Sequence, residues 1–169
     1  MVSIFFTCIL GIIGFTSLYL KYKNDKTKQE EVDAQIAQLD SSTGAQSYYR
    51  TYEQEVCNII KSYSGVEIVE EQIGKVSGYD MVFLYNNEEY YVEIKYLTKS
   101  KVGLGSLQRF LESVKGKEGN FWFIYNTEIT ELFRKKVKTL NSISSKRRIE
   151  LIKIETPIDL ESKLKTLLN

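Results

Sequence analysis

The amino-acid sequence predicts an α/β fold in which a mixed β-sheet is flanked by helices and preceded by one transmembrane helix. From residue 46 onward, segments with helical spacing of apolar residues alternate with short segments rich in aromatic and β-branched residues. Before them, the chain is uncharged from Val2 to Leu20. At about 1.5 Å per residue, such a helix nearly spans a hydrocarbon core of about 30 Å.

The predicted elements follow one another in a mixed order that favours a single sheet covered by helices. We expect Thr127 to cap the third of four helices, because a threonine before a run with Glu in its first turn is typical of a helix start. Asn86 and Asn87 are expected to form the turn of a hairpin. In chain order, the expected elements are a helix at 46–63, strands at 66–71, 79–85 and 90–97, a helix from Gly105 to about Lys117, a strand at 120–125, a helix at 128–141, a strand at 148–155 and a helix from Pro157.

We divide the chain into a membrane anchor (1–21), a polar helical stalk or linker (22–45) and a folded domain (46–169). Lysines follow the apolar run closely, so the positive-inside tendency places the folded domain in the cytoplasm of a single-pass protein. A buried core helix and a signal peptide are the alternatives for the apolar run. The stalk has one narrow apolar stripe, which favours a solvated spacer over a short coiled coil.

Composition excludes several kinds of chemistry. Lys and Arg total 23 and Asp and Glu total 22, so net charge gives no bulk attraction for nucleic acid and any phosphate-binding surface must be local. Histidine is absent, which removes the commonest general base, the usual zinc ligand and every Ser-His or Cys-His pair. Two cysteines, Cys8 and Cys57, do not indicate a disulfide framework.

Acidic residues occupy positions that the predicted hairpin brings together. With Asn86 and Asn87 as the two turn residues, Asp80 stands directly opposite Glu93. Directly opposed residues have Cβ atoms about 4.5 to 5.5 Å apart, and like charges there are destabilising unless something compensates. Strand alternation places Lys95 on the same face as Glu93. We therefore expect two acids and a lysine to converge.

This combination is typical of a hard divalent cation site. Asp80, Glu93 and the carbonyl of Ile94 are oxygen ligands that suit Mg²⁺ or Mn²⁺, which keep several waters and accept phosphate oxygens. Such an ion lowers the pKa of water and neutralises charge that develops on a phosphate. Lys95 is expected to orient the attacking water or to stabilise the transition state.

Asp80, a hairpin and then Glu93-Ile94-Lys95 resemble the PD-(D/E)xK nuclease motif. The wider pattern is similar to the Mrr-type branch of restriction endonucleases, from about residue 49 to residue 138, although Ser77-Gly78-Tyr79 stands where the motif's name has a proline. The resemblance implies a restriction-endonuclease-like fold and Mg²⁺-dependent cleavage of DNA phosphodiester bonds. It also implies that Glu53, in Tyr52-Glu53-x-x-Val56, is an additional active-site carboxylate and metal ligand.

Other candidate residues have simple structural alternatives. Glu53 is equally typical of a solvated helix charge, and Gln108, which the resemblance places near DNA, is typical of a helix surface. The tyrosines of the two long strands are more typical of packing than of base stacking. Three further basic residues are expected to approach phosphates flanking the site: Lys99, Lys101 and Arg109.

The sequence thus predicts a membrane-tethered endonuclease that cuts DNA with Mg²⁺ or Mn²⁺. The family resemblance implies a role in restriction or defence against foreign DNA. Because cutting both strands needs two sites, a homodimer is one expectation. The alternatives are a non-catalytic nuclease-like binding module at the membrane, since one fold hosts many functions, and an RNA-cleaving effector of the same fold.

Overall fold

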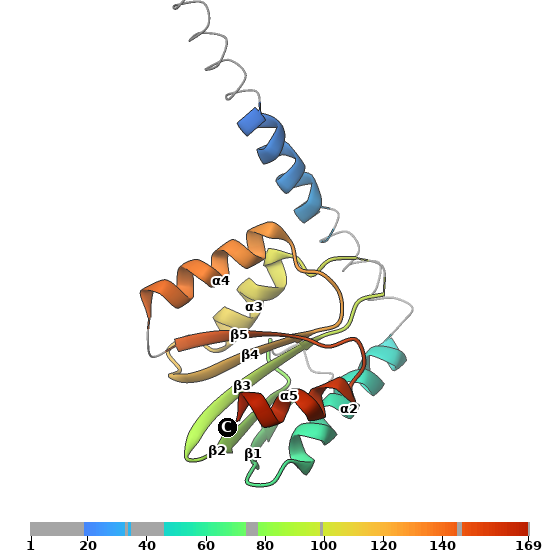
Figure 1. Ribbon diagram of the computed structural model, residues 1–169, viewed down its shortest axis with the longest axis vertical. Coiled ribbons are helices and arrows are strands. Elements are labelled where there is room, and N and C mark those ends of the chain that lie inside the picture. Colours follow the sequence, from blue (N-terminus) through green and yellow to red (C-terminus); the bar gives the residue numbers. More distant parts are fainter. Residues whose placement is uncertain are drawn as a thin grey trace, which may run out of the picture.

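The computed structural model describes residues 19–32, 34, 46–73, 78–98, 100–144 and 147–168. Within them the chain forms an α/β domain around a five-stranded mixed sheet with the strand order β1-β2-β3-β4-β5 (Figure 1). The predicted mixed sheet flanked by helices is confirmed. The elements are α2 (Gln46–Ser62), β1 (Glu67–Glu71), β2 (Met81–Tyr85), β3 (Glu88–Lys95), α3 (Leu104–Ser113), β4 (Gly119–Tyr125), α4 (Glu131–Ile143), β5 (Arg147–Lys153) and α5 (Asp159–Leu167).

The first three strands form an antiparallel meander whose register follows from its tight turn. Asn86 and Asn87 both have positive φ, 53° and 64°, as a two-residue turn that matches the twist of a hairpin requires. The pairing of β2 with β3 runs from Tyr85 opposite Glu88 to Met81 opposite Val92. This is the register expected from the sequence, so a continuation by one residue brings Asp80 to Glu93.

The last three strands are parallel, and helices cross between them. β3 pairs with β4 and β4 with β5 in parallel, through α3 and α4, which lie together on one face of the sheet, whereas α2 and α5 lie on the other (Figure 1). Each face has its own apolar core: Phe110, Phe123 and Phe133 contribute to the first, and Val56, Trp122 and Leu160 to the second. β3 lies between β2 and β4 and is covered on both faces.

The helix α4 begins later than the sequence predicts. Its cap is Thr130, whose side chain accepts a hydrogen bond from the Phe133 N–H, so the expected cap at Thr127 is wrong. The preceding residues extend the sheet instead, because Ile129 forms a parallel bridge with Val102 and is buried. Burial of an isoleucine therefore delays the helix by about one turn.

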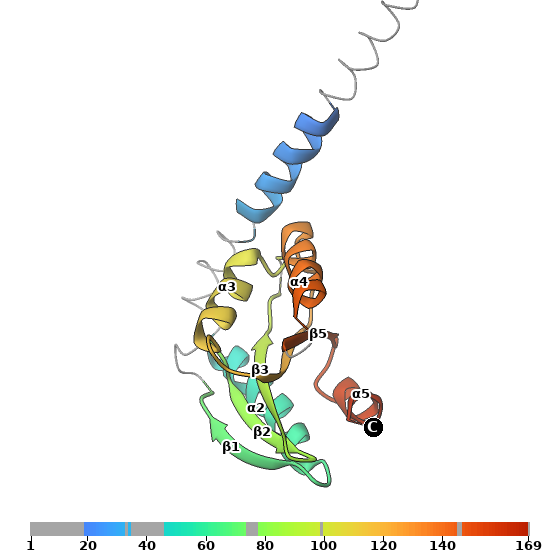
Figure 2. The same cartoon turned by 90° about the vertical axis from the view of Figure 1, so that its left-hand side faces the viewer.

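Residues 19–32 form an N-terminal helix that projects from the domain and meets it beside the ends of α3 and α4 (Figures 1 and 2). The helical stalk is observed in this stretch, but a solvated spacer is wrong for Thr27, Glu31 and Ala34, which are buried. Glu31 accepts a hydrogen bond from the N–H of Leu104, the first residue of α3, and one of 2.8 Å from the Thr130 hydroxyl. One carboxylate therefore joins the starts of two helices, where N–H groups lack intrahelical partners and negative charge is favoured.

Space for this contact comes from a glycine. A Cβ on Gly103 would lie 2.7 Å from Oε1 of Glu31 and 3.2 Å from Cβ of Ala34. An ion pair between Lys101 and Glu30 lies next to it. The N-terminal helix is thus packed onto the domain as well as bonded to it.

No helix among the described residues is long and apolar enough to cross a membrane. The predicted anchor (1–21) lies almost wholly outside the described residues, which begin at Tyr19.

We expect Glu31→Ala to release the N-terminal helix, because the Leu104 N–H and the Thr130 hydroxyl lose a shared acceptor worth about 1 to 3 kcal/mol. Amide hydrogen exchange of residues 19–32 should speed up in this variant and trypsin should cut there sooner. Glu55→Ala, which removes an exposed acid of α2, is the control. Equal exchange of residues 19–32 in the two variants would contradict the docking role of Glu31.

Candidate functional site

The central strand β3 carries an acid and a lysine at its carboxyl end. Oε1 of Glu93 lies 2.5 Å from Nζ of Lys95. Glu93 is only 2% exposed, whereas the side chain of Lys95 is 26% exposed. By strand alternation both side chains project to the face of Tyr91, under α3 and α4. Burial of an ion pair costs desolvation free energy that apolar residues would not, so this pair calls for an explanation beyond packing.

Asp80 joins this pair from the residue before β2. Its Oδ2 accepts a hydrogen bond of 2.7 Å from the backbone N–H of Ile94, which lies between Glu93 and Lys95. Its own N–H donates to the carbonyl of Val92 at 2.8 Å. Asp80 is 6% exposed. The first predicted acid is therefore tied directly to the strand that carries the other two groups.

Glu53 approaches the same place from α2. It is half-buried, and burial raises the pKa of its carboxyl to about 7, with a further increase from Asp80 and opposing attraction from Lys95 and Arg50. Interaction with Asp80 and Lys95 places Glu53 within electrostatic range of the other three groups. It is thus more than a solvated helix charge, although its role as a metal ligand stays a prediction.

The charges of the cluster do not balance. Burial raises the pKa of Glu93 to about 8, against the attraction of Lys95, and Asp80 and Glu53 raise it further. Burial also raises the pKa of Asp80. The pKa of Lys95 is raised because the attraction of Glu93, Asp80 and Glu53 exceeds the effect of desolvation. Three acids therefore surround one ammonium group.

The donor set fits a hard divalent cation. Two buried carboxyl groups at the ends of paired strands supply oxygen ligands of the type that Mg²⁺ prefers. Because their pKa values are raised even with the Lys95 ammonium group beside them, a further cation would favour their ionised, metal-binding form. Within the part of the chain that the structure describes, no three Asp, Glu or Cys side chains are placed so that they could hold one metal ion together. Any ion here would take its remaining ligands from the backbone, water or substrate.

A glycine sets the approach of Asp80 to the sheet. Gly78 has a φ of +83°, and a Cβ there would lie 2.9 Å from the carbonyl oxygen of Arg109 and 3.0 Å from Cβ of Ser113. Only a residue without a side chain meets both constraints. The segment before β2 can therefore lie against α3, and it leads through Asp80 into the strand.

The four residues expected to contact nucleic acid do not form one group in the structure. Gln108 and Arg109 are exposed on α3, and an Arg109 guanidinium nitrogen donates to the Ser106 hydroxyl at 3.4 Å. Lys101 is exposed but paired with Glu30 of the N-terminal helix. Lys99 lies outside the described residues. Contact of any of these with a phosphate stays a prediction.

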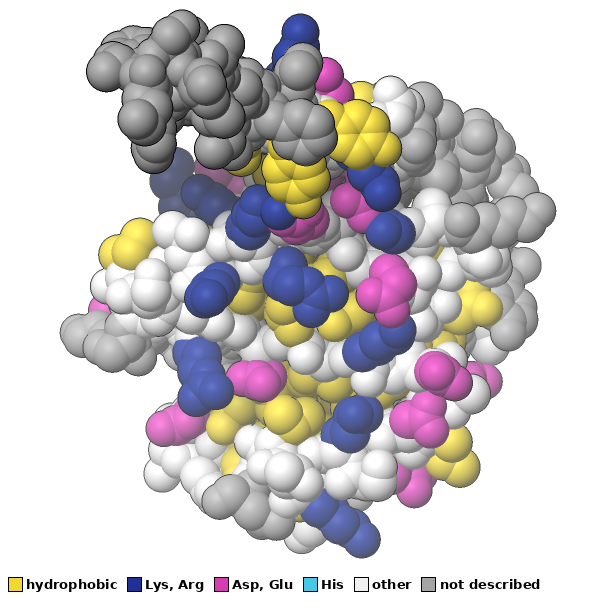
Figure 3. All heavy atoms as spheres, turned by 45° about the horizontal axis from the view of Figure 1, so that its top comes forward, with side chains coloured by type: hydrophobic (Ala, Val, Ile, Leu, Met, Phe, Trp, Pro, Cys, Tyr) yellow, Lys and Arg dark blue, Asp and Glu magenta, His cyan; other side chains and the backbone are white. Residues whose placement is uncertain are grey.

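Basic side chains gather near the carboxyl ends of the parallel strands. Lys153 ends β5, Lys101 follows β3 and Arg134 lies in the first turn of α4. All three lower the pKa of Glu128, chiefly through the Lys153 hydrogen bond, so they lie close together. Figure 3 shows Lys and Arg side chains interspersed with Asp and Glu over the face of the molecule that includes this end. Since Lys95 ends β3, the basic group and the acidic cluster share one edge of the sheet.

Sequence reasoning missed Asn126 and Arg50. The Asn126 side chain accepts from the Leu97 N–H at 2.8 Å and donates to the Leu97 carbonyl at 3.0 Å, which fixes the chain two residues after Lys95. In the sequence, the feature that could have indicated this role of Asn126 is an amide side chain directly after a buried strand. Arg50 lies one turn before Glu53 on α2, a spacing at which helical side chains interact.

Comparison of the chain with protein-family models, curated proteins and solved structures finds no match in any of the three.

We expect the metal-free protein to lose stability as the pH rises from 4.5 through about 8. In the folded state the pKa of Glu93 is raised from 4.5 to about 8, so folding favours the protonated carboxyl. This contribution to the free energy of unfolding is complete below pH 4.5 and is lost as the pH rises through the folded-state pKa. Glu93→Gln should flatten the decline in unfolding free energy, measured by denaturant titration at several pH values. Glu55→Gln serves as the control, and an unchanged slope in Glu93→Gln would disprove the assignment.

We expect Gly78→Ala to destabilise the domain more than Gly116→Ala. Both glycines have a positive φ, +83° and +76°, but a Cβ at Gly116 meets nothing within 4 Å. Both substitutions carry the conformational cost of about 1 to 2 kcal/mol, so their difference isolates the contact of Gly78 with α3. The two unfolding free energies should differ; equal values would mean that the segment before Asp80 does not need this close approach.

Proposed function

We propose that this protein is a metal-dependent endonuclease of the restriction-endonuclease-like kind, which hydrolyses DNA phosphodiester bonds with Mg²⁺ or Mn²⁺. The observation that carries the proposal is the convergence of Asp80, Glu93 and Lys95 at the ends of two paired strands, with both acids buried. Buried ionisable groups with shifted pKa are candidates for function. The element order and the mixed sheet agree with what the resemblance to Mrr-type nucleases implies.

Two carboxylates and one backbone carbonyl of this chain would hold the cation. Asp80 and Glu93 supply the carboxylates. The N–H and the carbonyl of one strand residue point to the same neighbouring strand, so the carbonyl of Ile94 lies on the side of β3 from which its N–H reaches Asp80. When bound, the ion would lower the pKa of a water and neutralise charge on the phosphate.

Lys95 acts in this proposal as a hydrogen-bond donor. Its pKa is raised by three acids, so it stays protonated and is unsuited to accept the proton of water. Glu93 holds its ammonium group in place, where it can orient the attacking water or stabilise the charge of the transition state. Glu53 is a positioning residue in this proposal: when it is ionised, its charge beside Asp80 and Lys95 favours both the cation and the protonated lysine.

The remaining parts of the proposal concern place and partners. Residues 2–20 would tether the protein to a membrane, with the domain in the cytoplasm, and the lysines that begin at Lys21 support this orientation. The substrate would be DNA that reaches this compartment, as in restriction or defence. Among the basic residues at the carboxyl ends of the parallel strands, Lys153 and Lys101 are already paired with acids. Arg134 beside them would therefore supply the local positive charge for the DNA backbone. A homodimer would cut both strands.

We expect the full-length protein to cleave DNA in the presence of Mg²⁺ and Lys95→Ala to lose about 10²- to 10³-fold in rate, as removal of a transition-state donor does elsewhere. Lys136→Ala, at an exposed position of α4, is the matched control and should cleave like the wild type. Asp80→Asn tests the metal site separately, because Mg²⁺ should raise the thermal midpoint of the wild type but not of this variant.

Three outcomes separate the rival functions. Equal behaviour of the wild type and Lys95→Ala on both DNA and RNA would refute catalysis and favour a non-catalytic module. Cleavage of RNA but not DNA, with the same loss in Lys95→Ala, would keep the catalytic site and replace the substrate. A Mg²⁺ response that survives in Asp80→Asn would refute the assignment of the metal ligands.

A further inference from the structure

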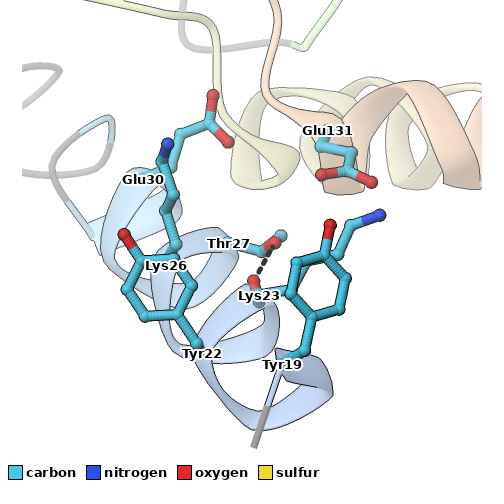
Figure 4. Close-up of a pocket in the computed structure, with 7 residues that line it drawn as sticks. All are labelled: Tyr19, Tyr22, Lys23, Lys26, Thr27, Glu30 and Glu131. Carbon is cyan, nitrogen blue, oxygen red and sulfur yellow. Dashed lines mark hydrogen bonds between the residues drawn. The ribbon is translucent and has the colours of Figure 1, made fainter. Parts of the chain in front are cut away.

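A pocket of about 270 Å³ lies between the N-terminal helix and the start of α4 (Figure 4). This volume is several times the share of about 30 Å³ that one water occupies in the liquid. The pocket lies apart from the candidate metal site, and its residues have no role in the proposed hydrolysis. It is lined by Tyr19, Tyr22, Lys23, Lys26, Thr27, Glu30 and Glu131.

The charges around the pocket favour an anion. Each of the two lining carboxylates already has an ammonium partner outside the lining: Lys101 pairs with Glu30, and Lys135 lies 2.9 Å from Glu131. Lys23 and Lys26 add two further positive charges, so four ammonium groups face two carboxylates. In Figure 4 these two lysines lie on opposite sides of the pocket, with Thr27 between them and Lys23 turned toward Glu131.

Aromatic side chains accompany both lysines. Tyr19 precedes Lys23 and Tyr22 precedes Lys26 by four residues each, the spacing at which side chains share a helix face. Tyr19, Leu20 and Tyr22 are 60%, 63% and 68% exposed, which is unusual for three large apolar residues within one turn. Tyr next to Lys is typical of the membrane interface, where the rings lie at headgroup level and the ammonium groups meet lipid phosphate.

We infer that this pocket binds the phosphate headgroup of an anionic phospholipid. The inference rests on the proposed membrane tether, because the apolar run ends at Leu20 and places the pocket within about two helical turns of the bilayer surface. A lipid is favoured over nucleic acid because the exposed tyrosines and Leu20 offer apolar contact beside the lysines, which a phosphate backbone does not use.

Headgroup binding would also orient the domain. Glu31, two turns after Lys23, bonds to the starts of α3 and α4, so a lipid held by Lys23 and Lys26 is linked to the sheet through one rigid helix. The pocket therefore fixes which end of the domain faces the membrane, in addition to the tether that keeps it there.

The test is lipid retention by the full-length protein in a nonionic detergent, measured by native mass spectrometry. The probes are phosphatidylglycerol and phosphatidylcholine with the same acyl chains. We expect the wild type to retain phosphatidylglycerol preferentially. Lys23→Gln/Lys26→Gln should retain it about 10- to 30-fold more weakly, because two lysines near an anionic lipid surface together strengthen binding by about this factor. Lys136→Gln/Lys138→Gln makes the same charge change on the exposed side of α4 and should behave like the wild type.

Several results would overturn the inference. One is equal retention of phosphatidylglycerol by the wild type and the pocket variant, and another is the same loss of retention in the control variant. A third is displacement of the lipid by millimolar inorganic phosphate. The last is a pocket variant that keeps the lipid but loses binding to a short DNA duplex. Failure of the membrane tether is read separately, by carbonate extraction of membranes that contain the protein. Failure of the proposed catalysis is read from Mg²⁺-dependent cleavage by the pocket variant, which should equal that of the wild type.

Discussion

Desolvation of three carboxylates around a single ammonium group is the interaction on which the candidate site depends. Burial raises the pKa of Asp80 and Glu93, and Lys95 neutralises only part of their charge. A protein domain is only marginally stable, by about 5 to 15 kcal/mol, so an arrangement that disfavours its own charged form is costly to keep. The cation that we propose for this site would remove this cost, because it would replace the lost hydration of the carboxylates and leave Lys95 to act on another partner.

The topology of the sheet explains why these groups can meet. β3 has an antiparallel neighbour on one side and a parallel neighbour on the other, so the start of β2 and the ends of β3 and β4 lie at the same edge. Asp80 precedes β2 and Lys95 ends β3, which brings an acid from one loop against groups of the central strand. Gly78 and Asn126 then hold the flanking segments through a close backbone contact and two side-chain hydrogen bonds. The site is therefore built on strand ends, which are more rigid than free loops.

The local part of this arrangement could be predicted from the sequence, and the long-range part could not. Asn86 and Asn87 determine the hairpin register because a two-residue turn leaves no choice of pairing, and the meeting of Asp80 with Glu93 follows from it. The start of α4 was misplaced because burial of Ile129 against Val102 depends on a segment far away in the chain. The burial of Glu31 is not predictable for the same reason, because the sequence of a polar helix does not indicate which of its acids contacts two other helices.

That buried acid changes how the two ends of the protein are related. A solvated spacer would let the domain sample many orientations. It would only raise the local concentration of the domain near the proposed membrane anchor. Because Glu31 joins the N-terminal helix to α3 and α4, whose starts lie at the carboxyl ends of the parallel strands, the helix and the candidate site share one rigid frame. The position of Lys23 and its neighbours relative to the edge of the sheet where Lys95 lies is therefore set by the hydrogen bonds of a carboxylate rather than by a flexible chain.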